Sequence, residues 1–208
     1  MATPFPEAAT EKCWDRLGKA KRALHMCRNA LVGQGFAEFT SQWADFLNHT
    51  GGVIHAIESG ARMSPQRRQW YGKVARESRA DPFLRYFHQA RNAEEHGTDR
   101  TTAIDGSSFT LDEHGGTYRA QGPGPMIDVS DEGVRLNPGM RRSVEGISPT
   151  IAYTPEGPRL KTVTDDRYGD AYPPPTTFGG RSVSARDPVD MGEVYLAYLE
   201  ELIKECAS

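Results

Sequence analysis

Glycine and proline divide this sequence into two stretches of different character. Residues 1–97 contain 8 glycines and 4 prolines, whereas the shorter stretch from residue 98 to residue 188 contains 12 glycines and 10 prolines. Proline breaks helices and glycine weakens them, so long helices are expected in the first stretch only. The second stretch is typical of short strands joined by turns.

Four segments of the first stretch carry apolar residues at steps of three and four, the period of an amphipathic helix. The first two cover about residues 7–31 and 36–58, and Gly51-Gly52 is expected to kink or split the second. The other two begin at Ser64-Pro65 and Asp81-Pro82, in each case a capping residue followed by proline at the first helical position. The last of them ends before Gly97, a residue suited to a left-handed cap. Four such helices with short connections predict a four-helix bundle.

The rest of the chain predicts a small sheet and one more helix. Short apolar or alternating runs between residues 100 and 175 indicate an antiparallel sheet of hairpins. Asp187-Pro188 begins a helix whose apolar stripe is expected to pack back on the body of the protein. We therefore expect an α+β fold in three parts: a four-helix bundle at residues 1–97, a β-rich segment at 98–186 and a C-terminal helix at 187–208.

Several classes of protein are disfavoured by what the sequence lacks. No apolar run reaches the roughly 18–20 residues of a membrane span, and the N-terminus lacks the basic and then apolar pattern of a secretory signal. The three cysteines are widely spaced, which argues against a disulfide scaffold and against a cysteine zinc site. Phosphate-cradling and dinucleotide-binding glycine loops are absent, as is a nucleophile elbow. We expect a cytoplasmic protein with no membrane association, no metal and no cofactor.

Charge is distributed unevenly along the chain. Residues 1–97 hold 14 Lys and Arg against 10 Asp and Glu, whereas residues 98–208 hold 11 against 18. A basic half beside an acidic half fits a module that binds a polyanion, and it also fits ordinary variation of surface charge. Within the third helical segment, the residues that would either extend a phosphate-binding face or simply face solvent are Arg67, Arg68, Arg76 and Arg79.

The fourth helical segment changes character midway. Its first turns are aromatic and apolar, and its last two turns are polar, with Arg91-Asn92 followed by Ala-Glu-Glu-His96. An arginine followed five positions later by a histidine arises by chance in a chain of this composition. The signal therefore depends on its context, the end of the last helix of a predicted bundle.

In that context the string resembles the signature of the HEPN superfamily of nucleic-acid-acting domains. That signature is an arginine, four to six residues and then a histidine, with a polar residue directly after the arginine, where this chain has Asn92. The resemblance covers about residues 7–97, and the string is similar to those of bacterial HEPN-like proteins. It implies a four-helix bundle for this part of the chain.

The resemblance also implies a metal-independent endoribonuclease, in which the ribose 2′-hydroxyl attacks the neighbouring phosphate. His96 would be the general acid and base, because histidine titrates near neutral pH. Arg91 would hold the phosphate and stabilise the charge of the transition state. Asn92 would orient the phosphate or the histidine, and His88 and Glu95 are the further candidates for substrate binding.

A two-fold homodimer that joins two such helices into one cleft is part of what the resemblance implies. RNA is then the expected partner, in a defence or toxin–antitoxin setting, with an antitoxin or regulatory protein as a further partner.

Two other interpretations of the same residues stay open. Arg91 and Glu95 are spaced for an ordinary i,i+4 ion pair, and His96 is placed for a cap favoured by the helix dipole. The first stretch would then be a non-catalytic HEPN-like module that binds RNA or protein, or an unrelated helical interaction domain.

Overall fold

The computed structural model describes most of the chain, and its contacts divide the chain into two compact units. One unit comprises Met1–Ala103 and Pro158–Ser208, and the other comprises Ile104–Gly157. The sequence predicts divisions after residue 97, from the glycine and proline content, and after residue 186, from the helix start at Asp187-Pro188, and these positions do not coincide with the unit bounds. The described residues are 4–33, 35–97, 100–105, 108–113, 116–121, 127–130, 133–136, 140–142, 150–154, 157–165 and 168–207.

The first unit is mostly helical, and with its short strand pairs it confirms the expected α+β class. Its helices are α1 (Glu7–Gly33), α2 (Phe36–Ala61), α3 (Pro65–Ala80), α4 (Pro82–His96) and α5 (Pro188–Ala207). Helix α2 runs without a break through Gly51-Gly52, so the expected split does not occur.

The helix starts follow the predicted capping chemistry. Ser64 Oγ accepts from the backbone N–H of Arg67 at 3.2 Å, and Asp81 Oδ1 accepts from Phe83 and Leu84. The end of α4 differs from expectation, because Gly97 has φ −88° and is not left-handed. Glycine is favoured there by a close approach, since a Cβ would lie 2.6 Å from the carbonyl oxygen of Ala93.

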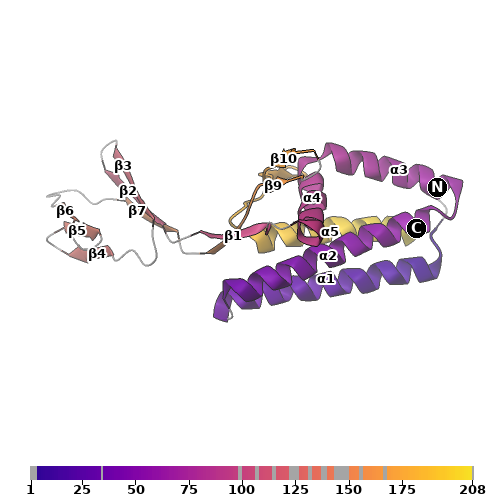
Figure 1. Cartoon of the computed structure of the whole chain (residues 1–208), viewed down its shortest axis with the longest axis horizontal. Coiled ribbons are helices and arrows are strands. Elements are labelled where there is room, and N and C mark those ends of the chain that lie inside the picture. Colours follow the sequence, from indigo (N-terminus) through magenta and orange to yellow (C-terminus); the bar gives the residue numbers. More distant parts are fainter. Residues whose placement is uncertain are drawn as a thin grey trace. The chain divides into compact units, whose positions relative to one another are not determined.

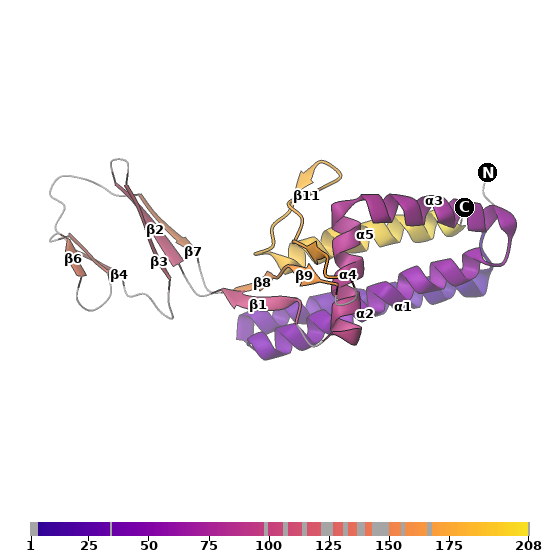
Figure 2. The same ribbon diagram turned by 45° about the horizontal axis from the view of Figure 1, so that its top comes forward.

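The arrangement of the helices does not confirm a four-helix bundle built from residues 1–97. Helices α1 and α2 lie side by side, and α5 packs along both of them (Figure 1). Helix α4 crosses α2 (Figure 2), and α3 contacts α2 and α4, the helices before and after it in the chain. The C-terminal helix is therefore an integral part of the helical core.

Aromatic packing explains why α5 belongs to this core. Phe87 of α4 stacks on Tyr195 of α5 with ring centroids 4.3 Å apart, and it also contacts Trp43 and Phe46 of α2. Phe83, one turn earlier, lies 4.9 Å from Phe87 between ring centroids. The apolar first half of α4 is thus buried between α2 and α5, and the first four helices alone would lack the contacts that α5 makes with it.

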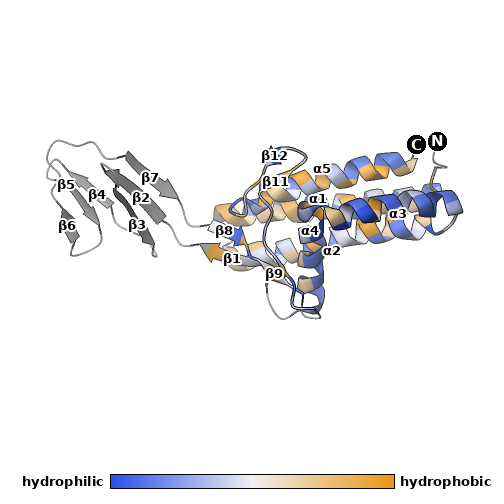
Figure 3. Ribbon diagram, turned by 90° about the horizontal axis from the view of Figure 1, so that it is seen from above, coloured by the Kyte–Doolittle hydropathy of each residue, from blue (hydrophilic) through white to orange (hydrophobic). Residues whose placement is uncertain are grey.

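Helix α3 differs from the others in having little buried surface. Val74 is its one fully buried residue, and Trp70 and Tyr71 pack partly against the core. Figure 3 shows α3 as mostly hydrophilic, in contrast to the apolar stripes of α1, α2 and α5. Most of α3 therefore faces solvent.

Short strand pairs accompany the helices, and the two strands of the first pair extend past the bounds of the first unit at Ala103 and Pro158. β1 (Thr102–Asp105) pairs with β8 (Gly157–Leu160), β9 (Val163–Thr164) with β10 (Ala171–Tyr172), and β11 (Thr177–Phe178) with β12 (Arg181–Ser182). Gly179 and Gly180, both with positive φ, form the turn of the last pair, as a tight hairpin requires. Phe178 stacks on Phe83 with centroids 4.4 Å apart, which connects this hairpin to α4.

The described residues of the second unit form two antiparallel three-stranded sheets, in agreement with the expected hairpins. One has the order β3 (Gly116–Gln121), β2 (Ser108–Glu113), β7 (Thr150–Thr154), and Leu111 pairs with both Tyr118 and Ile151. The other has the order β4 (Ile127–Ser130), β5 (Gly133–Leu136), β6 (Met140–Arg142).

The helices and the cysteines can be compared with the expectations of no membrane span and no disulfide scaffold. Among the described residues, the helices are either too short or too polar to cross a membrane. The three cysteines are buried free thiols, and burial raises the pKa of Cys13 to about 11 and that of Cys27 to about 12.

The role of α5 in the core predicts a large effect of a cavity in that helix. Leu199 is fully buried, whereas Leu31 of α1 is 48% exposed. We expect Leu199→Ala to lower the free energy of unfolding by about 2–5 kcal/mol, and Leu31→Ala to lower it by less than about 1 kcal/mol. Urea unfolding followed by circular dichroism measures both. Equal losses for the two variants would contradict the placement of α5.

Candidate functional site

The candidate site occupies the second half of α4, where the helix leaves the core. The first three turns of α4 are anchored by its buried residues, which are Phe83, Leu84, Tyr86, Phe87 and Ala90. None of residues 91–96 is fully buried. The polar end of the helix is thus rigidly held at its base and open to solvent.

Arg91 is positioned by its passage across α2 at Gly51. A Cβ at Gly51 would lie 3.0 Å from Arg91 Nε and 3.1 Å from Arg91 Cγ. The Nε atom is buried and has no hydrogen-bond partner. Gly51 therefore allows the arginine stem to lie directly on the α2 backbone, which limits the directions open to the guanidinium.

The guanidinium of Arg91 is held by two neighbours on its own helix. It forms an ion pair with Glu95, and its Nη1 donates to Asn92 Oδ1 at 3.2 Å. The side chains of Arg91 and Glu95 are 35% and 38% exposed. An i,i+4 pair of this exposure contributes only a few tenths of a kcal/mol.

One carboxylate oxygen connects the two principal residues of the motif. Glu95 Oε2, which pairs with Arg91, also lies 3.4 Å from His96 Nε2. The His96 side chain is 73% exposed at the end of the helix. One carboxylate oxygen thus lies within 4 Å of both the guanidinium and the imidazole, although five helical steps separate Arg91 from His96.

His88 joins the cluster through Asn92. Asn92 Nδ2 lies 3.5 Å from His88 Nδ1, and with the amide donating, the ring nitrogen accepts and is unprotonated. Although the ring is open to solvent on one side, desolvation by the surrounding protein lowers the pKa of His88, and the positive charges of Arg91 and Arg79 lower it further.

Glu94 is separated from the cluster. Its Oε1 accepts from the backbone N–H of Thr101 at 2.8 Å and from Thr101 Oγ1 at 2.7 Å. This carboxylate therefore anchors the chain just after α4 and does not share the role of Glu95.

The structure brings together all five residues that the sequence indicates: His88, Arg91, Asn92, Glu95 and His96. Two neighbours come from other helices. Sequence reasoning missed the contact of Gly51 with Arg91, and it named Arg79 for a phosphate-binding face without placing it beside His88. The Gly51-Gly52 pair was a signal, but it was interpreted as a kink and not as a close approach. Nothing in the sequence alone indicates that Arg79 of α3 lies near His88.

The candidate side chains lie at the surface, with that of His96 73% exposed. Two depressions of about 350 and 360 Å³ are lined elsewhere, the first by residues of α1 and α5 and the second by Arg85, Tyr172 and their neighbours. A small depression of about 40 Å³ adjoins the end of α4 and is lined by Ala93, Gly97 and residues of the segments 100–101 and 161–164. Within the described residues, no group of three His, Cys, Asp or Glu side chains could hold a metal ion. An extended ligand fits such a surface better than a small enclosed one.

Comparison with known protein families, with curated proteins and with solved structures finds no match to this chain.

The charges around His88 predict a measurable coupling between α3 and α4. We expect an NMR titration of His88 to show a midpoint below 6.5 that rises toward 6.5 in Arg79→Gln, because a nearby positive charge is removed. Arg68→Gln, about 16 Å away along the same helix, is expected to have a much smaller effect. An unchanged midpoint in Arg79→Gln would contradict the proximity of the two residues.

A lowered His88 pKa also sets the sign of its contribution to stability. The unfolded chain takes up the His88 proton near pH 6.5, and the folded protein takes it up only at lower pH. The free energy of unfolding therefore falls as the pH drops from about 6.5 through the folded pKa.

Proposed function

We propose that the protein is a metal-independent endoribonuclease in which Arg91 and His96 act on one phosphodiester. The observation that supports this proposal is the shared contact of both residues with one carboxylate oxygen of Glu95. Groups that both reach one anionic oxygen also both reach an oxygen of a phosphate. The resemblance to the HEPN superfamily supports the same assignment.

In this mechanism the ribose 2′-oxygen loses its proton and bonds to phosphorus, and the bond from phosphorus to the 5′-oxygen breaks. The products are a 2′,3′-cyclic phosphate and a 5′-hydroxyl. His96 transfers a proton, and Arg91 stabilises the charge that grows on the non-bridging oxygens. Asn92, bonded to both Arg91 and His88, positions them.

Two proton transfers are needed, one from the attacking oxygen and one to the leaving oxygen. A two-fold dimer that joins two α4 ends would supply a second His96 for this purpose. The homodimer, and a toxin–antitoxin or defence setting with a regulatory partner, are proposals that follow from the family resemblance.

The first test compares wild type with His96→Ala and Arg91→Ala on a mixed RNA in EDTA at low salt. We expect both variants to lose at least about 100-fold in rate, because each removes a transition-state interaction. Products of the wild type should end in 2′,3′-cyclic phosphate. His25→Ala, which changes an exposed histidine on α1, is the matched control and should retain full activity.

Equal rates in wild type, His96→Ala and Arg91→Ala would contradict the proposal, because the activity would then arise elsewhere or from a contaminant. Absence of cleavage by pure wild type under these conditions would also count against it.

A non-catalytic module that binds RNA is the second candidate function. The observation that favours it is the Arg91–Glu95 ion pair, which neutralises the arginine in the free protein. The two candidates share the phosphate-binding role of Arg91 and differ in whether His96 transfers a proton.

Replacing Glu95 tests the phosphate-binding role that both candidates need. We expect Glu95→Gln to tighten binding of single-stranded RNA about threefold or more at low salt, because the carboxylate no longer competes with phosphate. Fluorescence anisotropy measures the change, and Glu11→Gln, an exposed carboxylate of α1, is the control for net charge. If Glu95→Gln binds RNA no more tightly than wild type, Arg91 does not bind a phosphate of the RNA.

A further inference from the structure

The solvent-facing side of α3 carries a row of arginines. At about 100° per residue, Arg68, Arg76 and Arg79 lie within about 80° of one another around the helix axis. All three side chains are exposed. We call these three residues the arginine stripe, and it spans about 16 Å along the helix.

The arginine stripe is not neutralised by the protein itself. In the part of the chain that the structure describes, Arg68, Arg76 and Arg79 take part in no ion pair, and Glu77 approaches Lys73 at 3.9 Å. Arg67 belongs to a different face of α3, where it contacts Pro4 and lies over the ring of Phe5. Three cations are therefore available to an external anion.

A glycine lies in the middle of this row. Gly72 falls between Arg68 and Arg76 on the same side of the helix, and a Cβ built on it would have no neighbour within 4 Å. An exposed glycine within a helix costs about 1 kcal/mol relative to alanine. Its position exposes the helix backbone between the arginines, where a bulky chain can approach closely.

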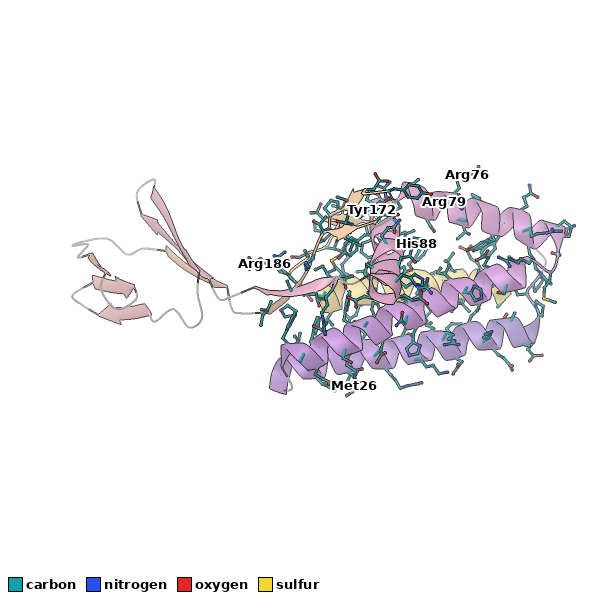
Figure 4. The ribbon with its side chains drawn as sticks, in the orientation of Figure 1. Met26, Arg76, Arg79, His88, Tyr172 and Arg186 are labelled. Carbon is teal, nitrogen blue, oxygen red and sulfur yellow. The ribbon has the colours of Figure 1, made fainter. Side chains whose placement is uncertain are left out.

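The arginine stripe leads to the candidate site. The C-terminal end of α3 is joined to the start of α4 through Asp81. The positive charge of Arg79 lowers the pKa of His88. Figure 4 shows Arg76 and Arg79 along α3 and His88 on α4 below the junction of the two helices. Asn92 connects His88 to Arg91 by hydrogen bonds, so the C-terminal end of the arginine stripe lies on the side of α4 that carries the candidate site.

We infer that the arginine stripe binds the sugar–phosphate backbone of a single-stranded RNA, a later phosphodiester of which reaches Arg91 and His96. This inference rests on the proposed function, and it names the surface that holds the polymer. Guanidinium groups bind phosphate oxygens in pairs, and such contacts carry no base information. The stripe therefore binds RNA without sequence preference.

Chemistry selects a single strand over a duplex. Attack by a 2′-oxygen requires that oxygen, phosphorus and the leaving 5′-oxygen to lie in line, which the regular backbone of an A-form helix prevents. A flexible single strand can adopt this geometry while its other phosphates remain on the stripe. Binding should then weaken steeply with salt, as for any contact that releases counterions.

The test uses Gly72, because this position is open and central. Gly72→Lys, Gly72→Gln and Gly72→Glu all introduce better helix formers than glycine, so each is expected to fold. Gln and Glu have nearly the same shape and differ in charge, and Lys places the opposite charge on a slightly longer side chain. The probe is a fluorescein-labelled 15-nucleotide oligouridylate with 2′-O-methyl groups, which cannot undergo 2′-oxygen attack.

We expect affinity at low salt to follow the order Lys, Gln, Glu, with about a tenfold difference in Kd between Gly72→Lys and Gly72→Glu that shrinks as salt is added. Arg76→Gln with Arg79→Gln is expected to lower the slope of log K against log salt by about 2. The matched control, Lys12→Gln with Arg22→Gln on α1, removes the same charge and should leave the affinity unchanged.

Equal affinities across the Gly72 series would overturn the inference, as would an equal loss in the α1 control. A 15-base-pair RNA duplex is compared with the single-stranded probe for the affinity order Lys, Gln, Glu at position 72. If that duplex shows the same order and binds more tightly than the single-stranded probe, the choice of a single strand is overturned. Because the probe cannot be cleaved, the affinity order is independent of catalysis. A preserved order together with inactive wild type would reject the ribonuclease and retain the RNA-binding stripe.

Discussion

The burial of the first half of α4 between α2 and α5 is the interaction on which the rest of the structure depends. Phe87 stacks on Tyr195 and contacts Trp43, so one aromatic ring joins three helices. This packing sets the direction of α4, and with it the passage of Arg91 over Gly51 and the approach of Arg79 to His88. The polar end of the helix is placed by apolar contacts at its base.

Signals that act within one element were predictable from the sequence. The helix starts at Ser64 and Asp81 follow from capping chemistry, and the grouping of Arg91 with Glu95 follows from helical spacing. Contacts between helices that are far apart in the sequence could not be predicted from such local signals. The stripe of α5 indicates a buried face, but no local signal says that this face covers Phe87 and makes a bundle of residues 1–97 incomplete.

In the candidate site too, residues on one helix were predictable and contributions from other helices were not. Its five polar residues lie on one helix, and their periodicity places them together. Gly51 and Arg79 come from other helices, so their contributions depend on the crossing of α4 over α2 and on the packing of α3. A glycine pair inside a helix can mark a kink in the helix, or a place where another side chain lies directly on the helix backbone. Only the contact of Gly51 with Arg91 shows that the second applies here.

The Arg91–Glu95 pair bears directly on which anions such a site would bind. An exposed i,i+4 pair is worth about 0.3–0.5 kcal/mol, so a phosphate must overcome roughly a twofold disadvantage to replace the carboxylate. A free phosphate has to do so with the contacts of this site alone. Under the inferred role of the stripe, a polymer held by Arg76 and Arg79 would present a later phosphodiester at high effective concentration and would overcome the same disadvantage easily. Under the proposed function, Glu95 and the arginine stripe together therefore favour long RNA over small phosphate anions.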